Sequence, residues 1–248
     1  LEHEIDILCS KLKSVEDNKL NFVSNVSHEL KSPLTNIKGY IQLLIDIKLD
    51  DEAQKEYLNI ILNEVNRISN LINSLIKLSK LDENEEKLVK EAFDLNEITR
   101  QSLIPFINRI EEKNLSFVDN ICSEKLVVFA DKQQIIQTIS NLVDNAIKYT
   151  QKHGKISIQT FKENNKAVFA IQDNGIGISN EDLKHIFDRF YVAKKSRTDV
   201  SSTGLGLSIC KKIIEMHDEE IKVKSEFGRG TEFKFQLKLN EVSDRNDS

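Results

Sequence analysis

One histidine of this chain has the neighbours that nucleophilic chemistry requires. His28 lies in the segment Ser27-His28-Glu29-Leu30-Lys31-Ser32-Pro33-Leu34. A neutral imidazole is nucleophilic near neutral pH. An adjacent carboxylate can hold the Nδ1 proton and leave Nε2 free to attack. We identify His28 as a candidate nucleophile and Glu29 as its orienting partner; the alternative is a plain exposed histidine on a helix face.

Two glycine-rich clusters in the second half of the chain suit a nucleotide. They are Asp173-Asn174-Gly175-Ile176-Gly177 and Thr203-Gly204-Leu205-Gly206-Leu207. Asp173 follows an alternating segment, so its carboxylate can accept a hydrogen bond from an exocyclic amine such as N6 of adenine. The second cluster opens a predicted helix, whose first backbone N–H groups and positive dipole end favour phosphate. Ordinary turns are the alternative for both clusters.

Two amides lie four residues apart in Asn141-Leu142-Val143-Asp144-Asn145-Ala146-Ile147-Lys148-Tyr149. Residues at i and i+4 project from one face of a helix. A magnesium ion that bridges nucleotide phosphates prefers oxygen ligands. The side-chain oxygen of Asn145 can supply one without adding negative charge.

These four clusters, in this order, resemble the transmitter region of sensor histidine kinases, and the resemblance covers nearly the whole chain. It implies a two-component signalling kinase that uses ATP and Mg²⁺, phosphorylates His28 and passes the phosphoryl group to an aspartate in a response-regulator receiver domain. By the same resemblance the metal ligand is Asn145, with Asn141 as its partner. Lys148 then meets the phosphates and Tyr149 the base, or the two are a solvated lysine and a packed tyrosine.

The resemblance also assigns the remaining nucleotide contacts. It places Asp173, Gly175, Gly177 and the hydroxyl of Thr231 near adenine. Phe187 and Phe190 are hydrophobic support. The phosphate contacts that it assigns come from Thr203, Gly204, Leu205, Gly206 and Leu207. The segment 191–202 is interpreted as a lid whose cations, Lys194, Lys195 and Arg197, meet the γ-phosphate, or else as a solvated loop.

Three departures from the family pattern stand out. Ser202 occupies the position of a family glycine, and His217-Asp218-Glu219 replaces a His-Gly-Gly turn. Glu29-x-x-Ser32 stands where the family carries a threonine or asparagine for phosphatase activity. A serine hydroxyl can still orient water, so we expect Ser32 to support dephosphorylation of the partner.

The elements that position these groups fall into two parts. Apolar residues at Ile5, Leu8, Leu12 and Val15 are spaced like a coiled-coil seam. The series Leu58, Ile61, Val65, Ile68, Ile72, Leu75 predicts a second amphipathic helix. With a turn near 49–51 the two helices form a hairpin. Its apolar stripe is too wide to cover itself, so we expect a homodimeric four-helix bundle; the alternative is a hairpin packed on its own second domain.

The rest of the chain predicts an α/β sandwich, one layer of each, and the fold class is therefore α+β. We expect strands at 93–95, 115–121, 126–130, 155–161, 166–172, 220–226 and 231–239. Glu163-Asn164-Asn165, between the fourth and fifth of these strands, indicates a hairpin turn. Asn96 is expected to cap a helix that runs to about Lys113, and further helices are expected at 133–148 and after Leu205. Residues 1–82 form the phosphotransfer hairpin, with 1–20 as a signal-transmitting helix; residues 83–240 form the ATP-binding domain, and 241–248 a polar tail.

Composition excludes several other classes. The 248 residues carry a formal net charge of −5 without a clustered basic face, so no nucleic-acid partner is expected. Cys9, Cys122 and Cys210 are far apart, which favours buried thiols in a reducing compartment. His3, His153, His185 and His217 lack metal-site spacing and are interpreted as structural or surface residues. No apolar run is long enough to cross a membrane. We expect the chain to be the cytoplasmic portion of a protein that is anchored in the cell membrane through a sensor region absent from this chain.

Two rival functions remain open. An ATPase of the same superfamily would hydrolyse ATP to drive a conformational change, but it leaves the His28 segment unexplained. A non-catalytic scaffold would bind a receiver domain through the hairpin, but it leaves the nucleotide clusters unexplained.

Overall fold

The chain forms two compact units, a helical one that ends at Ile76 and a second one that begins at Lys77. The computed structural model describes residues 2–47, 49–82, 87–193 and 203–240, and for residues 2–21 it describes the backbone alone. The predicted lid cations Lys194, Lys195 and Arg197 and the predicted tail 241–248 lie outside this range.

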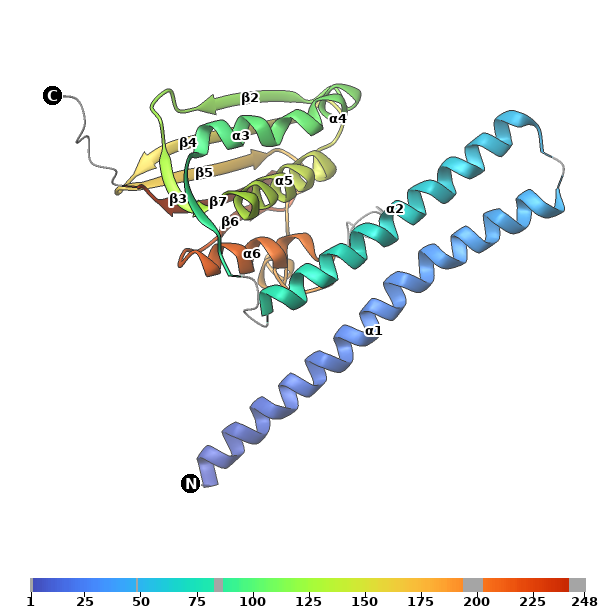
Figure 1. Ribbon diagram of the computed structural model, residues 1–248, viewed down its shortest axis with the longest axis horizontal. Helices are drawn as coiled ribbons and strands as arrows, with labels where there is room; N and C mark the ends of the chain where they lie inside the picture. Colours follow the sequence, from blue (N-terminus) through green and yellow to red (C-terminus); the bar gives the residue numbers. More distant parts are fainter. Residues whose placement is uncertain (1, 48, 83–86, 194–202, 241–248) are drawn as a thin grey trace. The chain divides into compact units, whose positions relative to one another are not determined.

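The first unit is a helical hairpin (Figure 1). Helix α1 (Glu2–Asp46) runs through Pro33, and helix α2 (Asp51–Asp82) begins where the carboxylate of Asp50 accepts a hydrogen bond from Ala53 N–H at 2.8 Å. The rings of Tyr40 and Tyr57 meet across the two helices, with centroids 5.4 Å apart. The predicted hairpin is therefore confirmed.

Large apolar side chains remain exposed along both helices of the hairpin. On α1 they are Val23, Leu34, Ile41, Leu43 and Ile45, and on α2 they are Leu58, Leu62, Val65, Ile72 and Ile76. An apolar surface of this extent on a small unit is typical of an interaction face.

The second unit contains a five-stranded mixed sheet in the order β2-β4-β5-β7-β6. The strands are β2 (Ser116–Ile121), β4 (Lys155–Glu163), β5 (Lys166–Asp173), β6 (Lys222–Glu226) and β7 (Gly230–Lys238). Only β2 and β4 pair in parallel, while the other pairs are antiparallel. Strands β1 (Lys90–Asp94) and β3 (Val127–Asp131) form a separate antiparallel pair.

Helices α3 (Leu95–Leu103), α5 (Lys132–Tyr149) and α6 (Gly206–Met216) lie together over one face of this sheet (Figure 1). Ile135, Ile139 and Leu142 of α5 are fully buried, as their spacing along the helix predicts. On the sheet, Phe169 of β5 stacks on Phe235 of β7 with ring centroids 5.1 Å apart. The predicted α/β sandwich is confirmed.

The last turn of α2 belongs to the second unit. Leu78 and Leu81 are buried, and Asp82 forms an ion pair with Arg189 at 2.6 Å. Helix α2 is therefore continuous to Asp82, and its residues from Lys77 onward are part of the second unit.

Two local predictions were wrong. The cap of α3 is Asp94, whose carboxylate accepts from Asn96 N–H, and Asn96 is buried with its amide donating to the carbonyls of Cys122 and Glu124. The helix also does not continue to Lys113. It ends at Leu103, and a 3₁₀ turn at Ile104–Phe106 separates it from α4 (Ile107–Glu112), since Pro105 lacks the N–H that a continuous helix requires.

The hairpin turn between β4 and β5 was predicted correctly. Asn164 and Asn165 both have positive φ, 48° and 60°, which matches the twist of a two-residue antiparallel connection.

Within the described residues, no helix is long and apolar enough to cross a membrane.

Candidate functional site

A cavity in the second unit gathers several of the predicted nucleotide contacts. Its wall includes six of them: Asn145, Tyr149, Asp173, Gly177, Leu207 and Thr231. Ile176, Ile178, Ile186 and Phe233 make the rest of the wall largely apolar. An apolar pocket with a few convergent polar groups is suited to a planar base.

Among the described residues of this wall, Asp173 is the one carboxylate. It ends β5 opposite Thr231 of β7, and it is 8% exposed. Its Oδ1 accepts a hydrogen bond from Gly175 N–H at 2.8 Å. Burial raises the pKa of Asp173 to about 6, although the backbone N–H groups of Gly175 and Thr231 oppose this shift. At neutral pH it is therefore an ionised acceptor inside an apolar pocket.

The loop after Asp173 packs closely against the backbone of Tyr149 and of Glu226. A Cβ on Gly175 would overlap the carbonyl of Tyr149, and one on Gly177 (φ 64°) would overlap the carbonyl of Glu226. Ile176 N–H donates to the Tyr149 carbonyl at 3.2 Å. Glycine is required at both positions because the backbones approach so closely.

Ser225 orients the hydroxyl of Thr231, a role that our sequence analysis did not identify. Ser225 Oγ donates to the Gly230 carbonyl at 2.8 Å and accepts from Ile178 N–H at 2.8 Å. It lies 2.9 Å from Thr231 Oγ1. Because Ser225 has only one hydroxyl proton, Thr231 is the donor in this pair, and its oxygen remains an acceptor toward the cavity.

The two asparagines of α5, Asn141 and Asn145, differ in their contacts. Asn145 lines the cavity, whereas Asn141 donates its amide to the carbonyl of Gly206 at 3.3 Å. Asn141 therefore connects α5 to the start of α6. Lys148 Nζ lies 5.7 Å from the ring centroid of Tyr149.

The C-terminal end of α5 is held by Lys113, a second residue missed in the sequence. Its ammonium donates to the carbonyls of Ile147, Lys148 and Thr150 at 2.8, 3.1 and 3.2 Å. A cation stabilises the carbonyl end of a helix. Lys113 thereby holds the turn that carries Lys148 and Tyr149.

The second glycine cluster begins α6. Gly204 has φ 66°, and its carbonyl accepts from Phe190 N–H at 3.0 Å. Leu205 is fully buried, so its side chain is a core residue and not a ligand contact. Leu207 reaches the cavity, and Leu205, the N-cap residue of α6, makes no side-chain cap hydrogen bond. Thr203 adjoins the segment 194–202, which lies outside the described residues.

Phe187 packs edge-on against Phe233 with centroids 6.4 Å apart, which supports its predicted role beneath the cavity. Phe190, the other predicted support, has φ 61°. Tyr191 lines the cavity, and its hydroxyl donates to Asp182.

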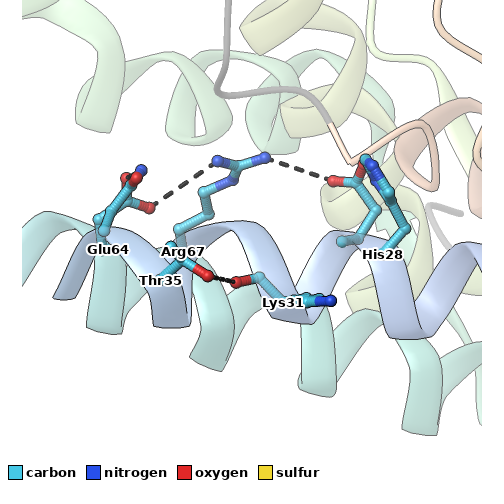
Figure 2. A network of polar contacts seen from close by, with 7 residues as sticks. His28, Lys31, Thr35, Glu64 and Arg67 are labelled. Atoms are coloured by element: carbon cyan, nitrogen blue, oxygen red, sulfur yellow. Dashed lines mark hydrogen bonds and ion pairs between the residues drawn. The ribbon is translucent and has the colours of Figure 1, made fainter. Parts of the chain in front are cut away.

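The candidate nucleophile lies in the hairpin (Figure 2). The side chain of His28 is 83% exposed, and its Nδ1 lies 3.8 Å from Oε1 of Glu29. This distance is longer than that of a hydrogen bond. Ser32, one turn further along α1, is also exposed.

The other histidines differ in their surroundings. His185 is exposed and lies 2.8 Å from Asp188, and His153 is exposed with φ 64°. His217 is buried, with its Nε2 accepting from Asp131 N–H and its Nδ1 donating to the Ile213 carbonyl. Burial lowers the pKa of His217, so the ring is held neutral.

Two family models match the two units in order. The His Kinase A (phospho-acceptor) domain matches residues 18–84, and the histidine kinase-, DNA gyrase B- and HSP90-like ATPase matches residues 130–241. The chain belongs to the sensor histidine kinases.

Similar proteins agree with this family. The sensor protein SrrB of Staphylococcus aureus is 34% identical over 226 residues, which is 90% of this chain and 39% of SrrB. The chain thus spans well under half of this relative. The histidine kinase AdeS of Acinetobacter baumannii has a TM-score of 0.70 and 28% identity, covering 86% of this chain and 98% of AdeS. The kinase ThkA, solved with the response regulator TrrA, has a TM-score of 0.74 and 32% identity over 89% of this chain and 61% of that one.

Proposed function

We propose that this chain phosphorylates its own His28 from ATP and then transfers the phosphoryl group to an aspartate of a response-regulator receiver domain. The observation that carries this proposal is the exposed imidazole of His28 beside Glu29, in a chain whose second unit holds the Asp173 cavity. ThkA, which is similar to this chain over both units, was solved in complex with a response regulator.

Adenine fits the polar groups of the cavity. The ionised carboxylate of Asp173 accepts from the exocyclic amine, and the apolar wall with Tyr149 covers the ring. The phosphates then extend toward Lys148 and toward the first backbone N–H groups of α6, which begins at Gly206. The lid cations Lys195 and Arg197 and the hydroxyl of Thr203 belong to the same proposed phosphate site.

The residues of the cavity also fit a magnesium ion. Within the described part of the chain, no cluster of three or more His, Cys, Asp or Glu side chains could hold a metal. An amide oxygen from Asn145, completed by phosphate oxygens and water, is instead the donor set that Mg²⁺ prefers. When bound, Mg²⁺ neutralises phosphate charge and aligns the triphosphate.

The protein supplies the nucleophile and the base. Nε2 of His28 forms a bond to the γ-phosphorus as the bond from that phosphorus to the β–γ bridging oxygen breaks, and ADP leaves. The ring becomes positively charged with its proton on Nδ1, which faces Glu29. The proton then leaves through Glu29 to solvent. In the second step Nδ1 regains a proton, and the P–N bond breaks as a carboxylate oxygen of the partner's aspartate bonds to the phosphorus, which gives an acyl phosphate and the neutral imidazole of His28.

The hairpin is the proposed dimer interface and the proposed docking site of the receiver domain. The exposed apolar residues of α1 and α2 support pairing with a second copy into a four-helix bundle. Sedimentation of the chain should show a dimer, and Leu62→Asp should produce monomers. The exposed hydroxyl of Ser32 supports a phosphatase activity toward the same partner.

Three further assignments belong to this proposal. The proposed domain limits are residues 1–82 and 83–240, with 1–20 as a signal-transmitting helix and 241–248 as a tail. They follow the end of α2 at Asp82, although the compact second unit already begins at Lys77. The chain is the cytoplasmic portion of a longer protein. That protein is anchored in the cell membrane through a sensor region outside these 248 residues.

Incubation with γ-labelled ATP and Mg²⁺ tests the proposal. We expect acid-labile, base-stable label on the wild-type chain and none on His28→Gln, with the dimer intact in both. Steady phosphate release without labelled protein would favour the ATPase alternative. Failure to bind ATP in calorimetry would favour the scaffold.

A further inference from the structure

A polar network crosses the hairpin next to His28 (Figure 2). Its centre is Arg67 of α2, whose Nη2 lies 3.3 Å from Oε2 of Glu29 on α1. The Nη1 atom lies 3.8 Å from Oε2 of Glu64, one turn earlier on α2. The amide of Asn36 donates to the other oxygen of Glu64 at 2.8 Å. Two carboxylates, one from each helix, therefore flank one guanidinium.

This network is partly shielded from water. The side chains of Arg67 and Glu64 are 17% and 14% exposed, and that of Glu29 is 27% exposed. Ion pairs on open surfaces contribute little because water screens them, whereas shielded pairs keep their geometry. The planar guanidinium can also hold two carboxylates in fixed directions, which an ammonium cannot.

Arg67 decides how Glu29 faces the imidazole. Neighbouring residues on a helix point in different directions, so sequence adjacency alone does not direct Glu29 toward His28. Because Oε2 of Glu29 is held by Arg67, the free oxygen Oε1 is the one that lies 3.8 Å from Nδ1 of His28.

We propose that Arg67 is a positioning residue for phosphoryl transfer to His28, acting through Glu29. This inference rests on the proposed kinase function. During attack by Nε2, positive charge develops on the ring and the Nδ1 proton must be accepted by Glu29. Arg67 keeps the carboxylate in the direction from which it does so, while Glu64 and Asn36 hold Arg67 in place.

The test is a double-mutant cycle on the rate of self-phosphorylation. We expect Arg67→Met to lower kcat about 10- to 100-fold, the scale of a misplaced general base, with the KM for ATP unchanged. In a Glu29→Gln background the same substitution should cause no further loss, because the group that Arg67 positions is already absent. Losses that multiply in the double mutant, or a raised KM, would overturn the inference.

Two further variants separate this role from a merely structural one. Arg67→Lys should recover part of the rate, because it keeps a charge but holds only one carboxylate well. It also serves if Arg67→Met fails to fold, as judged by circular dichroism. The matched control is Lys55→Met, an exposed cation on the same helix, which should retain the wild-type rate.

The outcomes distinguish this inference from the function on which it rests. If the wild-type chain takes no label, the proposed kinase function fails. If the wild type is labelled and Arg67→Met is labelled at the same rate, the kinase function stands and the role of Arg67 is wrong.

Discussion

The Nε2 atom of His217 accepts a hydrogen bond from the backbone N–H of Asp131 at 2.9 Å, which joins the end of α6 to the end of β3. Asp131 in turn caps α5, since its carboxylate accepts from Gln134 N–H at 3.1 Å. The neutral ring of His217 therefore links the strand pair β1–β3 and two helices that frame the nucleotide cavity.

This arrangement predicts acid-sensitive stability. The native state holds His217 neutral with a lowered pKa, whereas the unfolded chain protonates it below pH 6.5. The stabilisation is thus complete above pH 6.5 and is lost as the pH falls below that value. His217→Gln should cost about 1 kcal/mol at pH 7.5, and less at pH 5.5. Urea denaturation at both pH values measures this, and an unchanged penalty at pH 5.5 would contradict it.

Asp173→Asn should stabilise the second unit while weakening nucleotide binding. The native pKa of about 6 lies above the ordinary value of 3.8, so the native state binds the proton more tightly. The contribution of Asp173 to stability therefore falls as the pH rises from about 4 to about 6. At pH 7.5 the variant should gain about 1 to 3 kcal/mol, since one pKa unit corresponds to about 1.4 kcal/mol.

The same variant should bind ATP at least about tenfold more weakly, because the charged acceptor is lost. Calorimetry and denaturation on one sample measure both effects. If Asp173→Asn is less stable than the wild type at pH 7.5, the buried charge of Asp173 does not destabilise the folded state, and the prediction is wrong.

Asn141 and Asn145 form a matched pair of substitutions on α5. Asn145→Ala should abolish labelling of His28 and leave thermal stability unchanged, because Asn145 lines the cavity. Asn141→Ala should cost about 1 kcal/mol of stability, because its amide donates to the Gly206 carbonyl. Reversed effects on stability, measured by thermal denaturation, would contradict these assignments.

Gly230 and Gly228 offer a similar comparison in the β6–β7 turn. Both have positive φ, 114° and 83°, but a Cβ on Gly230 would overlap the carbonyl of Asp173 while one on Gly228 meets open space. Gly230→Ala should therefore cost about 3 kcal/mol or more and displace Asp173, whereas Gly228→Ala should cost about 1 kcal/mol. Equal losses in the unfolding free energy would mean that backbone strain alone sets the cost.

Local patterns predicted most of the elements. The 3-4 spacing of apolar residues in α2 and α5 and the alternation in β4 and β5 each depend on neighbours within one element. The turn at Asn164-Asn165 was predictable because asparagine tolerates positive φ. The interruption at Pro105 was also visible in the sequence, because proline lacks the N–H that a continuous helix requires.

Residues that act across elements could not be predicted in this way. Arg67 lies 38 positions from Glu29, and Ser225 lies 47 from Ile178. Nothing near Arg67 in the sequence indicates which helix it faces. Similarly, the i, i+4 spacing placed Asn141 and Asn145 on one face but could not show that Asn141 bonds to Gly206. Tertiary contacts decide these roles.

The central claim is that the phosphoryl group of ATP reaches the imidazole of His28. The most direct test is peptide mapping by mass spectrometry at alkaline pH after incubation with ATP and Mg²⁺. We predict one added phosphoryl group on the peptide that contains His28, localised to that residue. A phosphoryl group on any other residue, or none on a chain that hydrolyses ATP, would contradict this account.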